Sequence, residues 1–247
     1  TNYFAAAAKT RFGLPAERVH VVPMGIRVDD IASAAAPEER SGDGRRSSAP
    51  ARRDPRDNTP FTIGYLARIC PEKGLANLCD ALARLRASGR ECRLRAAGYL
   101  GRGDRGYLDA IRKQLEAQGG GNDFEYVGEV DRAGKRGFLQ SLDLFSVPTV
   151  YHEAKGLYIL EALAAGVPVV QPRHGSFPEL VESTGGGVLY DPCDANGLAD
   201  AIAELMDDPP CRRALARCGQ ATVRESYTDT LMADRMWALY KRLCHCS

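Results

Sequence analysis

A repeating alternation of short apolar runs and longer amphipathic stretches begins after Pro60, and it constrains the fold more than any other feature of the sequence. The apolar runs, which we expect to be strands, are Phe61–Ala67, Cys92–Ala97, Phe124–Val127, Leu144–Val147, Val167–Gln171 and Gly187–Tyr190. The stretches with helical spacing are 74–87, 107–118, 131–142, 157–165, 177–182, 195–206, 210–227 and 229–243. Strands that alternate with helices form βαβ units, whose parallel sheet is covered by helices on both faces. Since such crossovers are right-handed, the sequence predicts an α/β, Rossmann-like doubly wound domain.

The part of the chain before Pro60 follows a different pattern. An Ala-rich helix is expected at Phe4–Phe12 and a short strand at Val19–Val22. From about residue 37 to residue 60 the chain is rich in Ser, Gly, Pro and Asp, contains six arginines and shows no apolar period. Such a segment cannot bury a core, so we expect a linker or a flexible insertion there.

Charge and cysteine usage restrict the class of protein. The chain of 247 residues has 33 Lys plus Arg against 32 Asp plus Glu, a net charge of +1, so no nucleic-acid partner is expected. The longest apolar stretch, 157–170, is interrupted by Glu161, Gly166 and Pro168 and predicts no membrane span. The eight cysteines form no C-x-x-C pair and suit neither a zinc site nor a small disulfide framework. Free thiols indicate a reducing compartment, and we therefore expect a cytoplasmic protein.

Two loops at the carboxyl ends of predicted strands carry residues suited to chemistry. Ligands of doubly wound sheets bind at this edge, where the strand order reverses. Arg68 and Lys73 follow the first strand and precede a helix that starts near Gly74. Two cations beside the positive end of a helix favour an anion such as a pyrophosphate, although an ordinary solvated loop would also explain them.

The second loop carries a pair of carboxylates. Glu153 lies past the fourth strand, and Glu161 lies eight residues later, inside a helix that starts near Gly156. Carboxylates placed in this way accept hydrogen bonds from vicinal hydroxyls, as on a sugar ring or a ribose. The backbone N–H groups of Lys155, Gly156 and Leu157 are expected to face the same crevice.

Together these motifs resemble the carboxyl-terminal, donor-binding domain of retaining glycosyltransferases of family four, which have the GT-B fold. The resemblance runs from Val19 to about Tyr240. Its elements are the E-x7-E pair Glu153/Glu161, the run 161–170 that follows it, the Arg68-x4-Lys73-Gly74 loop, and the weaker matches 175–179 and 186–190.

The resemblance implies a role for each matching residue. Glu153 is expected to bind hydroxyls of the transferred sugar and Glu161 the nucleotide ribose. Arg68 and Lys73 are expected to grip the diphosphate, and Val130 to contact the base. Arg68, Lys73 and Glu153 are thus the expected catalytic residues, and no metal ion or other cofactor is expected. The expected donor-binding residues are Arg68, Lys73, Val130, Glu153, Lys155, Gly156, Leu157 and Glu161.

One position in the second loop departs from the family pattern. Lys155 stands where the family usually has an aromatic residue. This lysine could contact phosphate or acceptor, or it could be a solvated loop residue. The neighbouring His152 is expected in the pocket wall or in a hydrogen bond rather than in catalysis.

The resemblance also divides the chain into parts. Residues 1–27 are expected to be the tail end of an amino-terminal acceptor domain, residues 28–60 a linker and residues 61–227 the donor-binding domain. Residues 228–247 are expected to form a crossover helix that packs on the first domain. The chain starts with Thr1 rather than Met, which suggests a longer parent. We therefore expect donor binding, but not transfer, from this chain without the missing domain.

The expected activity of the parent is transfer of a hexose from a nucleotide-diphosphate sugar to an unidentified glycan, lipid or small-molecule acceptor. Peripheral association with the inner face of a membrane is compatible with that activity. The alternatives are a non-catalytic nucleotide-sugar-binding module and a sugar phosphorylase or non-hydrolysing epimerase on a related scaffold. A nicotinamide dehydrogenase is disfavoured because no fingerprint glycine loop follows the first strand.

Overall fold

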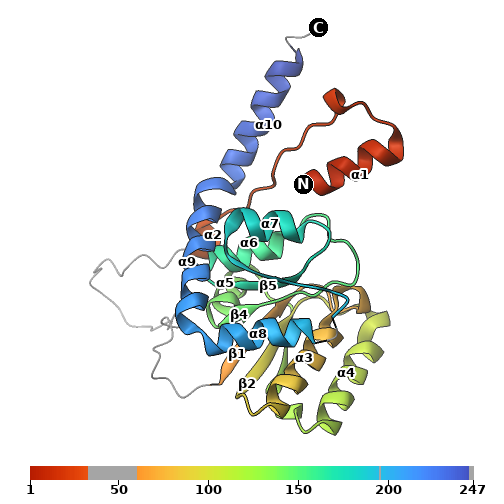
Figure 1. The fold of residues 1–247 in the computed structure, drawn as a ribbon, viewed down its shortest axis with the longest axis vertical. Helices are drawn as coiled ribbons and strands as arrows, with labels where there is room; N and C mark the ends of the chain where they lie inside the picture. The colour runs from red at the N-terminus through yellow and green to blue at the C-terminus, as the bar shows by residue number, and fades with distance from the viewer. Residues whose placement is uncertain (33–59, 195, 245–247) are drawn as a thin grey trace, which may run out of the picture.

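A computed structural model describes residues 1–32, 60–194 and 196–244, and its centre is one six-stranded parallel sheet (Figure 1). The strands are β1 Phe61–Leu66, β2 Cys92–Ala97, β3 Phe124–Gly128, β4 Leu144–Phe145, β5 Val169–Pro172 and β6 Gly187–Tyr190. Their order in the sheet is β3-β2-β1-β4-β5-β6, and every pairing is parallel. This order is that of a Rossmann-type doubly wound sheet, which confirms the expected fold class.

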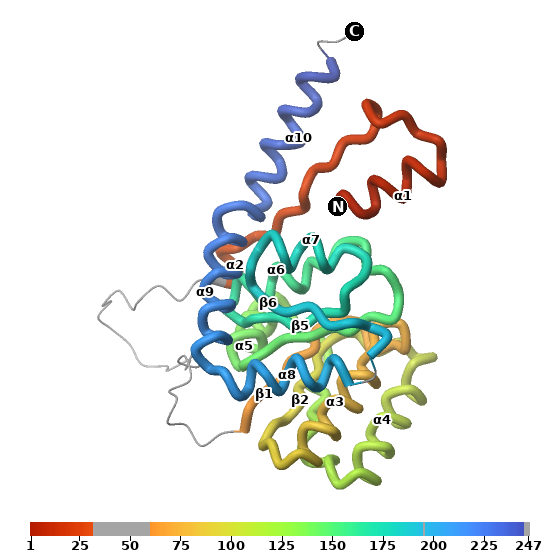
Figure 2. Tube along the Cα trace, viewed as in Figure 1, coloured from red at the N-terminus to blue at the C-terminus, as the bar shows by residue number. Residues whose placement is uncertain are grey.

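Helices cover both faces of the sheet. The helices of the described residues are α1 Asn2–Phe12, α2 Asp29–Ala32, α3 Leu75–Ala87, α4 Arg105–Ala117, α5 Arg132–Gln140, α6 Leu157–Ala164, α7 Phe177–Thr184, α8 Gly197–Asp207, α9 Pro209–Ser226 and α10 Asp229–Cys244. One layer contains α3, α4 and α8, the other contains α5, α6 and α7, and α9 packs on α6, α7 and α8 (Figure 2).

Apolar spacing explains why these elements bury the faces they do. All but the first residue of β1 are buried, as expected for a central strand with helices on both sides. In α3 the buried residues recur three or four positions apart and so form one apolar stripe. They are Leu75, Leu78, Cys79, Ala81, Leu82 and Leu85. The two periodicities therefore place one continuous core between the sheet and its helices.

Some predicted strand bounds were wrong. Residues 19–22 form no strand, since the described residues offer this segment no neighbouring strand to pair with. The fourth strand ends at Phe145 because the chain turns, and Thr149 donates its backbone N–H to the carbonyl of Val147. The fifth strand begins only at Val169, because the N–H of Val167 bonds to Ala162 and Pro168 has none.

The expected linker at 28–60 is partly folded. Val28 and Ile31 are buried, and α2 packs against α5 and α6, so residues 28–32 belong to the body rather than to a linker. Residues 33–59 lie outside the described residues. A parallel bridge from Ile26 to Thr228 ties the chain before α2 to the start of α10.

The last helix, α10, projects from the body, and α1 lies to one side of it (Figure 1). None of the residues of α10 is buried, and Trp237, Tyr240 and Leu243 are exposed. No helix among the described residues is both long and apolar enough to cross a membrane.

The strand order reverses between β1 and β4. The chain proceeds from β1 outward to β3 and then returns to β4 on the other side of β1, and a doubly wound sheet binds its ligand at such a switch point. Gly74 fixes how closely the loops after β1 and β4 approach. It has φ +74°, and a Cβ built there would lie 1.8 Å from the carbonyl oxygen of Pro148. The close contact of the two loops therefore requires glycine at this position.

We predict that Gly74→Ala destabilises the fold by about 3 kcal/mol or more, because it combines left-handed backbone strain with a clash against backbone. Gly89→Ala is the matched control, since Gly89 has φ +84° and nothing within 4 Å of an added Cβ. That variant should lose only about 1 kcal/mol. Urea denaturation of both variants measures the difference, and equal losses would contradict the packing role of Gly74.

Candidate active site at the β1/β4 switch point

The loops after β1 and β4 are joined by backbone as well as by side chains. The backbone N–H of Val150 donates to the carbonyl of Glu72 at 3.0 Å. Behind this contact, the one-turn helix Pro71–Lys73 turns the side chain of Lys73 into the protein, where the residue is only 9% exposed. A lysine is almost never buried to this degree without a partner.

The partner of Lys73 is Glu153, the first member of the carboxylate pair. The Nζ of Lys73 lies 2.5 Å from Oε2 of Glu153, and Glu153 is only 7% exposed. The hydroxyls of Tyr151 and Tyr158 each donate to the same oxygen at 3.0 Å. The other oxygen, Oε1, accepts from the backbone N–H groups of Ala154 at 3.0 Å and Lys155 at 3.3 Å. The carboxylate of Glu153 therefore receives five donors.

These contacts keep the pair ionised. Burial opposes ionisation of Glu153, but the hydrogen bond and charge of Lys73, the Lys155 N–H and the Tyr158 hydroxyl outweigh it and lower the pKa of Glu153 to about 2. Burial also disfavours the charged form of Lys73, yet the hydrogen bond that this lysine donates to Glu153 raises its pKa. The rings of Tyr151 and Tyr158 lie 5.1 and 5.3 Å from the Nζ and add cation–π attraction.

The second carboxylate, Glu161, has a different environment. It is the fifth residue of α6, and its Oε1 accepts from Nζ of Lys135 on α5 at 2.8 Å. Among the described residues, the other oxygen of Glu161 has no hydrogen-bond partner. The side chain of Glu161 is 19% exposed. Glu161 therefore retains one oxygen that can accept a hydrogen bond from a ligand, whereas both oxygens of Glu153 already accept hydrogen bonds.

The other predicted site residues lie around this pair. Arg68 is exposed, and within the described part of the chain its guanidinium has no hydrogen bond or ion pair. Lys155 is also exposed, and its backbone N–H donates to Oε1 of Glu153. Gly156 is buried with φ +60° and begins α6 without a side-chain cap, and Leu157 is half-buried. Val130, between β3 and α5, packs partly buried against the core.

Helix α1 docks beside the site. The carboxylate of Glu179, in the first turn of α7, accepts from the backbone N–H of Asn2 at 2.6 Å and from its side-chain amide at 3.1 Å. Tyr3 hydrogen-bonds Nδ1 of His152 through its hydroxyl. The Nε2 of His174 donates to the carbonyl of Thr149 at 2.9 Å. His152 thus takes part in a hydrogen bond at the wall of the site, as expected, and Glu179 holds α1.

Sequence reasoning missed four contributors to this region, namely Tyr151, Tyr158, Lys135 and Asn2. The two tyrosines flank Glu153 in the sequence, so an aromatic residue near a motif carboxylate was the available signal. Lys135 lies 26 positions from Glu161, and Asn2 lies 177 positions from Glu179. No local pattern connects either pair.

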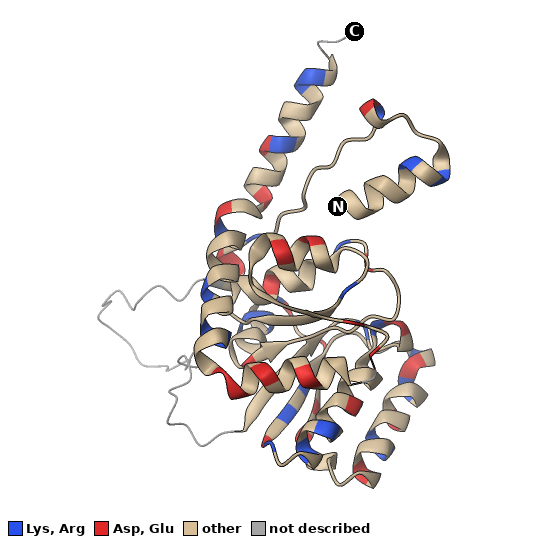
Figure 3. Cartoon of the chain, in the orientation of Figure 1, with Lys and Arg blue, Asp and Glu red and all other residues tan. Residues whose placement is uncertain are grey.

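The arrangement is suited to an anionic ligand that also carries hydroxyls. Arg68 and the amino-terminal end of α6 offer positive potential, the loop after β1 also carries Lys73, and Glu161 offers an acceptor. The described residues contain no group of three or more His, Cys, Asp or Glu side chains placed to hold a metal ion. Acidic and basic residues alternate over the helices of the body in this view, with no single-sign face (Figure 3).

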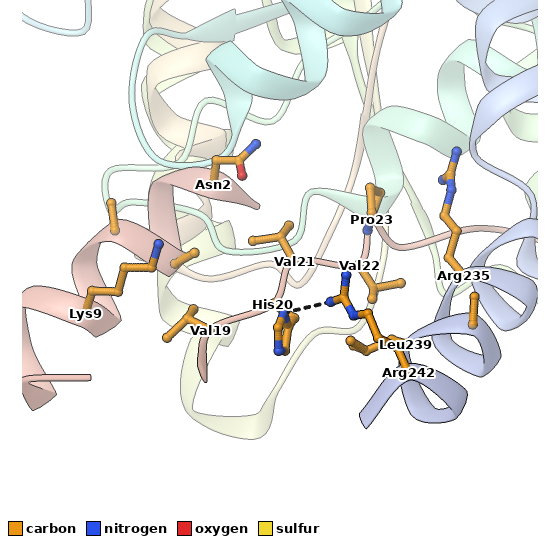
Figure 4. A pocket seen from close by; sticks show the side chains of 13 residues that line it. Asn2, Lys9, Val19, His20, Val21, Val22, Pro23, Arg235, Leu239 and Arg242 are labelled. Carbon is orange, nitrogen blue, oxygen red and sulfur yellow. Dashed lines mark hydrogen bonds between the residues drawn. The ribbon is translucent and has the colours of Figure 1, made fainter. Parts of the chain in front are cut away.

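A separate groove lies away from the sheet edge, between α1, residues 19–23 and α10 (Figure 4). Its volume is about 900 Å³. Arg242 of α10 reaches His20 across it, with Nη2 and Nδ1 3.3 Å apart. His20 therefore has a structural contact and no link to the Lys73–Glu153 pair.

Because the pKa of Glu153 is low in the folded protein, we predict that the stability of the fold depends on this residue in acid. Its pKa is about 2 in the folded protein against an ordinary value of 4.5, so the ionised form stabilises the fold above about pH 4.5. That contribution is lost as the pH falls from about 4.5 to about 2. We expect Glu153→Gln to be less stable at pH 7 and to lose less stability than wild type over this interval, measured by urea denaturation at each pH.

Glu182→Gln is the control for that experiment, because the ion pair of Glu182 with Arg173 is solvent-exposed on both sides. This variant should keep the acid dependence of the wild type. If Glu153→Gln kept it too, the coupling of Glu153 to Lys73 would contribute nothing to stability.

Comparison with known proteins identifies relatives of the chain. A family model described as glycosyl transferases group 1 matches residues 50–222. A phosphatidyl-myo-inositol mannosyltransferase of Mycobacterium leprae (strain TN) is 28% identical over 223 residues, which cover 89% of this chain and 52% of that protein. An alpha-D-kanosaminyltransferase of Streptomyces kanamyceticus is 26% identical over 231 residues, with coverages of 93% and 56%. The chain thus spans about half the length of these curated relatives.

Solved structures share the fold. Sucrose-phosphate synthase from Thermosynechococcus elongatus superposes with a TM-score of 0.76 at 24% identity, covering 98% of this chain and 57% of that one. Anabaena HepE, solved in complex with UDP, gives a TM-score of 0.78 at 21% identity, with coverages of 96% and 61%. The family model spans well over half of the chain, and the doubly wound sheet agrees with it. The chain therefore belongs to the group 1 glycosyl transferases.

Proposed function

We propose that this chain is the nucleotide-sugar donor-binding part of a retaining glycosyltransferase of family four, the carboxyl-terminal half of a GT-B enzyme. The observation that carries the proposal is the buried Lys73–Glu153 pair at the switch point of the sheet, with the exposed Arg68 on the same loop as Lys73. A doubly wound sheet binds its ligand at this place. The cations and the open acceptor of Glu161 match a diphosphate joined to a ribose.

The proposed chemistry is cleavage of the bond between the anomeric carbon of the sugar and a diphosphate oxygen. The bonding electrons leave with the diphosphate, so negative charge grows on that oxygen in the transition state. Arg68, Lys73 and the uncapped amino terminus of α6 would meet this charge, and one such fixed partner is commonly worth about 10²–10³ in rate. In this scheme protein cations, rather than a metal ion or another cofactor, neutralise the leaving group.

The main role of Glu153 would be to hold Lys73 in its charged form. A buried ammonium tends to lose its proton, and the carboxylate keeps Lys73 charged and fixed in direction. Glu161 would take a ribose hydroxyl on its free oxygen, and Val130 would border the base. Lys155, exposed just before α6, would contact phosphate or acceptor.

The donor, acceptor and location of the parent protein belong to the same proposal. A mannosyltransferase among the relatives is named as GDP-mannose-dependent, and Anabaena HepE has been solved with UDP-glucose. UDP and GDP are therefore the first nucleotides to test. The acceptor would be a glycan, a lipid or a small molecule, contributed through an amino-terminal domain against which α10 packs. A cytoplasmic enzyme peripheral to the inner face of a membrane fits relatives named for phosphatidylinositol acceptors.

We predict that one of UDP, GDP or ADP stabilises the chain by about 2.7 kcal/mol at 100 times its dissociation constant. Arg68→Ala should weaken that nucleotide about 10- to 100-fold, because a charge-assisted hydrogen bond is lost. Its stability without ligand should be unchanged, since Arg68 is exposed. Thermal denaturation with and without nucleotide measures both effects.

Arg217→Ala is the matched control, since it removes an exposed arginine on α9, outside the two loops. It should leave nucleotide affinity unchanged. Lys73→Ala is a poorer test, because it leaves Glu153 buried without its cation and should cost about 3–5 kcal/mol of stability. A folded wild type that responds to none of the three nucleotides would sink the proposal.

A further inference from the structure

The hydrogen bonds of Glu153 carry an inference about how the donor sugar enters the site, which rests on the function proposed above. We propose that the hydroxyl of Tyr151 is an exchangeable ligand of Glu153. It fills the acceptor position that a hydroxyl of the transferred sugar takes when the donor binds. Tyr151 is thus a positioning residue whose departure admits a sugar hydroxyl to Glu153.

The carboxylate of Glu153 already has as many hydrogen-bond donors as it can accommodate. A carboxylate offers about four lone-pair sites. Glu153 already accepts from Lys73, from two tyrosine hydroxyls and from two backbone N–H groups. A sugar hydroxyl would be a sixth donor. It can therefore bind Glu153 well only if one of the present donors leaves.

Four of the five donors to Glu153 are held in place. The N–H groups of Ala154 and Lys155 belong to the loop that carries Glu153 itself and are held by it. Lys73 is buried and is the charge partner of the carboxylate. Tyr158 is anchored in α6, with its ring 6.2 Å from Phe145 and 6.4 Å from Phe177.

Tyr151 differs in exposure from the other two side-chain donors, Lys73 and Tyr158. It is 38% exposed, and it lies in the loop between β4 and α6 rather than in a helix. Its hydroxyl can exchange Glu153 for water at little cost, because the hydroxyl is satisfied in either place. The loop itself need not move, since the hydroxyl of Thr149 bonds the carbonyl of Tyr151 at 2.9 Å and holds the backbone.

The exchange has a consequence for selectivity. Because Glu153 is ionised and accepts only, the group that replaces Tyr151 must donate a hydrogen bond. A donor sugar with a hydroxyl at that position restores the lost contact, whereas a nucleoside diphosphate without sugar leaves Tyr151 in place. The hydroxyl of Tyr151 therefore competes with the sugar and not with the nucleotide.

Tyr151→Phe tests this competition, since it removes the hydroxyl and keeps the ring over Lys73. The probes are UDP against UDP-glucose and GDP against GDP-mannose, with affinities for the 247-residue chain measured by isothermal titration calorimetry. We expect the variant to bind the sugar conjugate about 3- to 10-fold more tightly relative to its own nucleoside diphosphate than wild type does, because the conjugate no longer displaces a hydrogen bond. The affinity for the nucleoside diphosphate itself should not change.

Tyr158→Phe is the matched control, because it removes a hydroxyl from the same carboxylate oxygen at the same distance. Its ring is held in α6, so it should lower stability without raising the preference for the sugar conjugate. A Tyr151→Phe variant with the wild-type ratio, a lower ratio, or equal tightening of both ligands would overturn the inference while nucleotide binding upheld the proposed function. Failure of UDP and GDP to bind either protein would overturn both.

Discussion

The buried ion pair between Lys73 and Glu153 is the interaction on which the rest of the site depends. Two charges removed from water are stable only when each is closely paired and its remaining hydrogen-bonding capacity is filled. Here the pair is 2.5 Å apart, and two tyrosine hydroxyls and two N–H groups complete the carboxylate. Since Lys73 follows β1 and Glu153 follows β4, the same pair joins the two loops at the switch point of the sheet.

The two carboxylates of the E-x7-E pair differ because their surroundings differ. Glu153 lies inside a closed set of donors, and Glu161 has one cation on one oxygen and a second oxygen that no described residue contacts by a hydrogen bond. In the function we propose, the first glutamate mainly holds a catalytic lysine and the second is free to meet the ribose. Equivalent residue types therefore take unequal parts, and the difference comes from the number of donors around each.

Much of the fold was predictable because strand and helix periods are local properties. The runs at Cys92–Ala97 and Gly187–Tyr190 were predicted to the residue, and the parallel, doubly wound sheet followed from the alternation. The predictions failed where a neighbouring strand or a packing surface elsewhere in the chain decides the structure of a segment. Val19–Val22 has an apolar pattern but no neighbouring strand among the described residues, and residues 28–32 have a linker-like context but bury Ile31.

The sequence by itself indicated which loops carry the candidate site and which residue types they offer. Arg68, Lys73 and Glu153 stand in loops that follow recognisable strands, and Glu161 stands in the helix after the second of these loops. Only the tertiary structure decided how they combine. Lys73 meets Glu153 across 80 positions, Lys135 occupies Glu161, Glu179 holds the start of α1, and the N–H of Lys155 is used by Glu153. Each of these contacts joins segments through the strand order or a loop turn. Local spacing contains no information about such neighbours, because it fixes the direction of a side chain within its own element and not what packs against it.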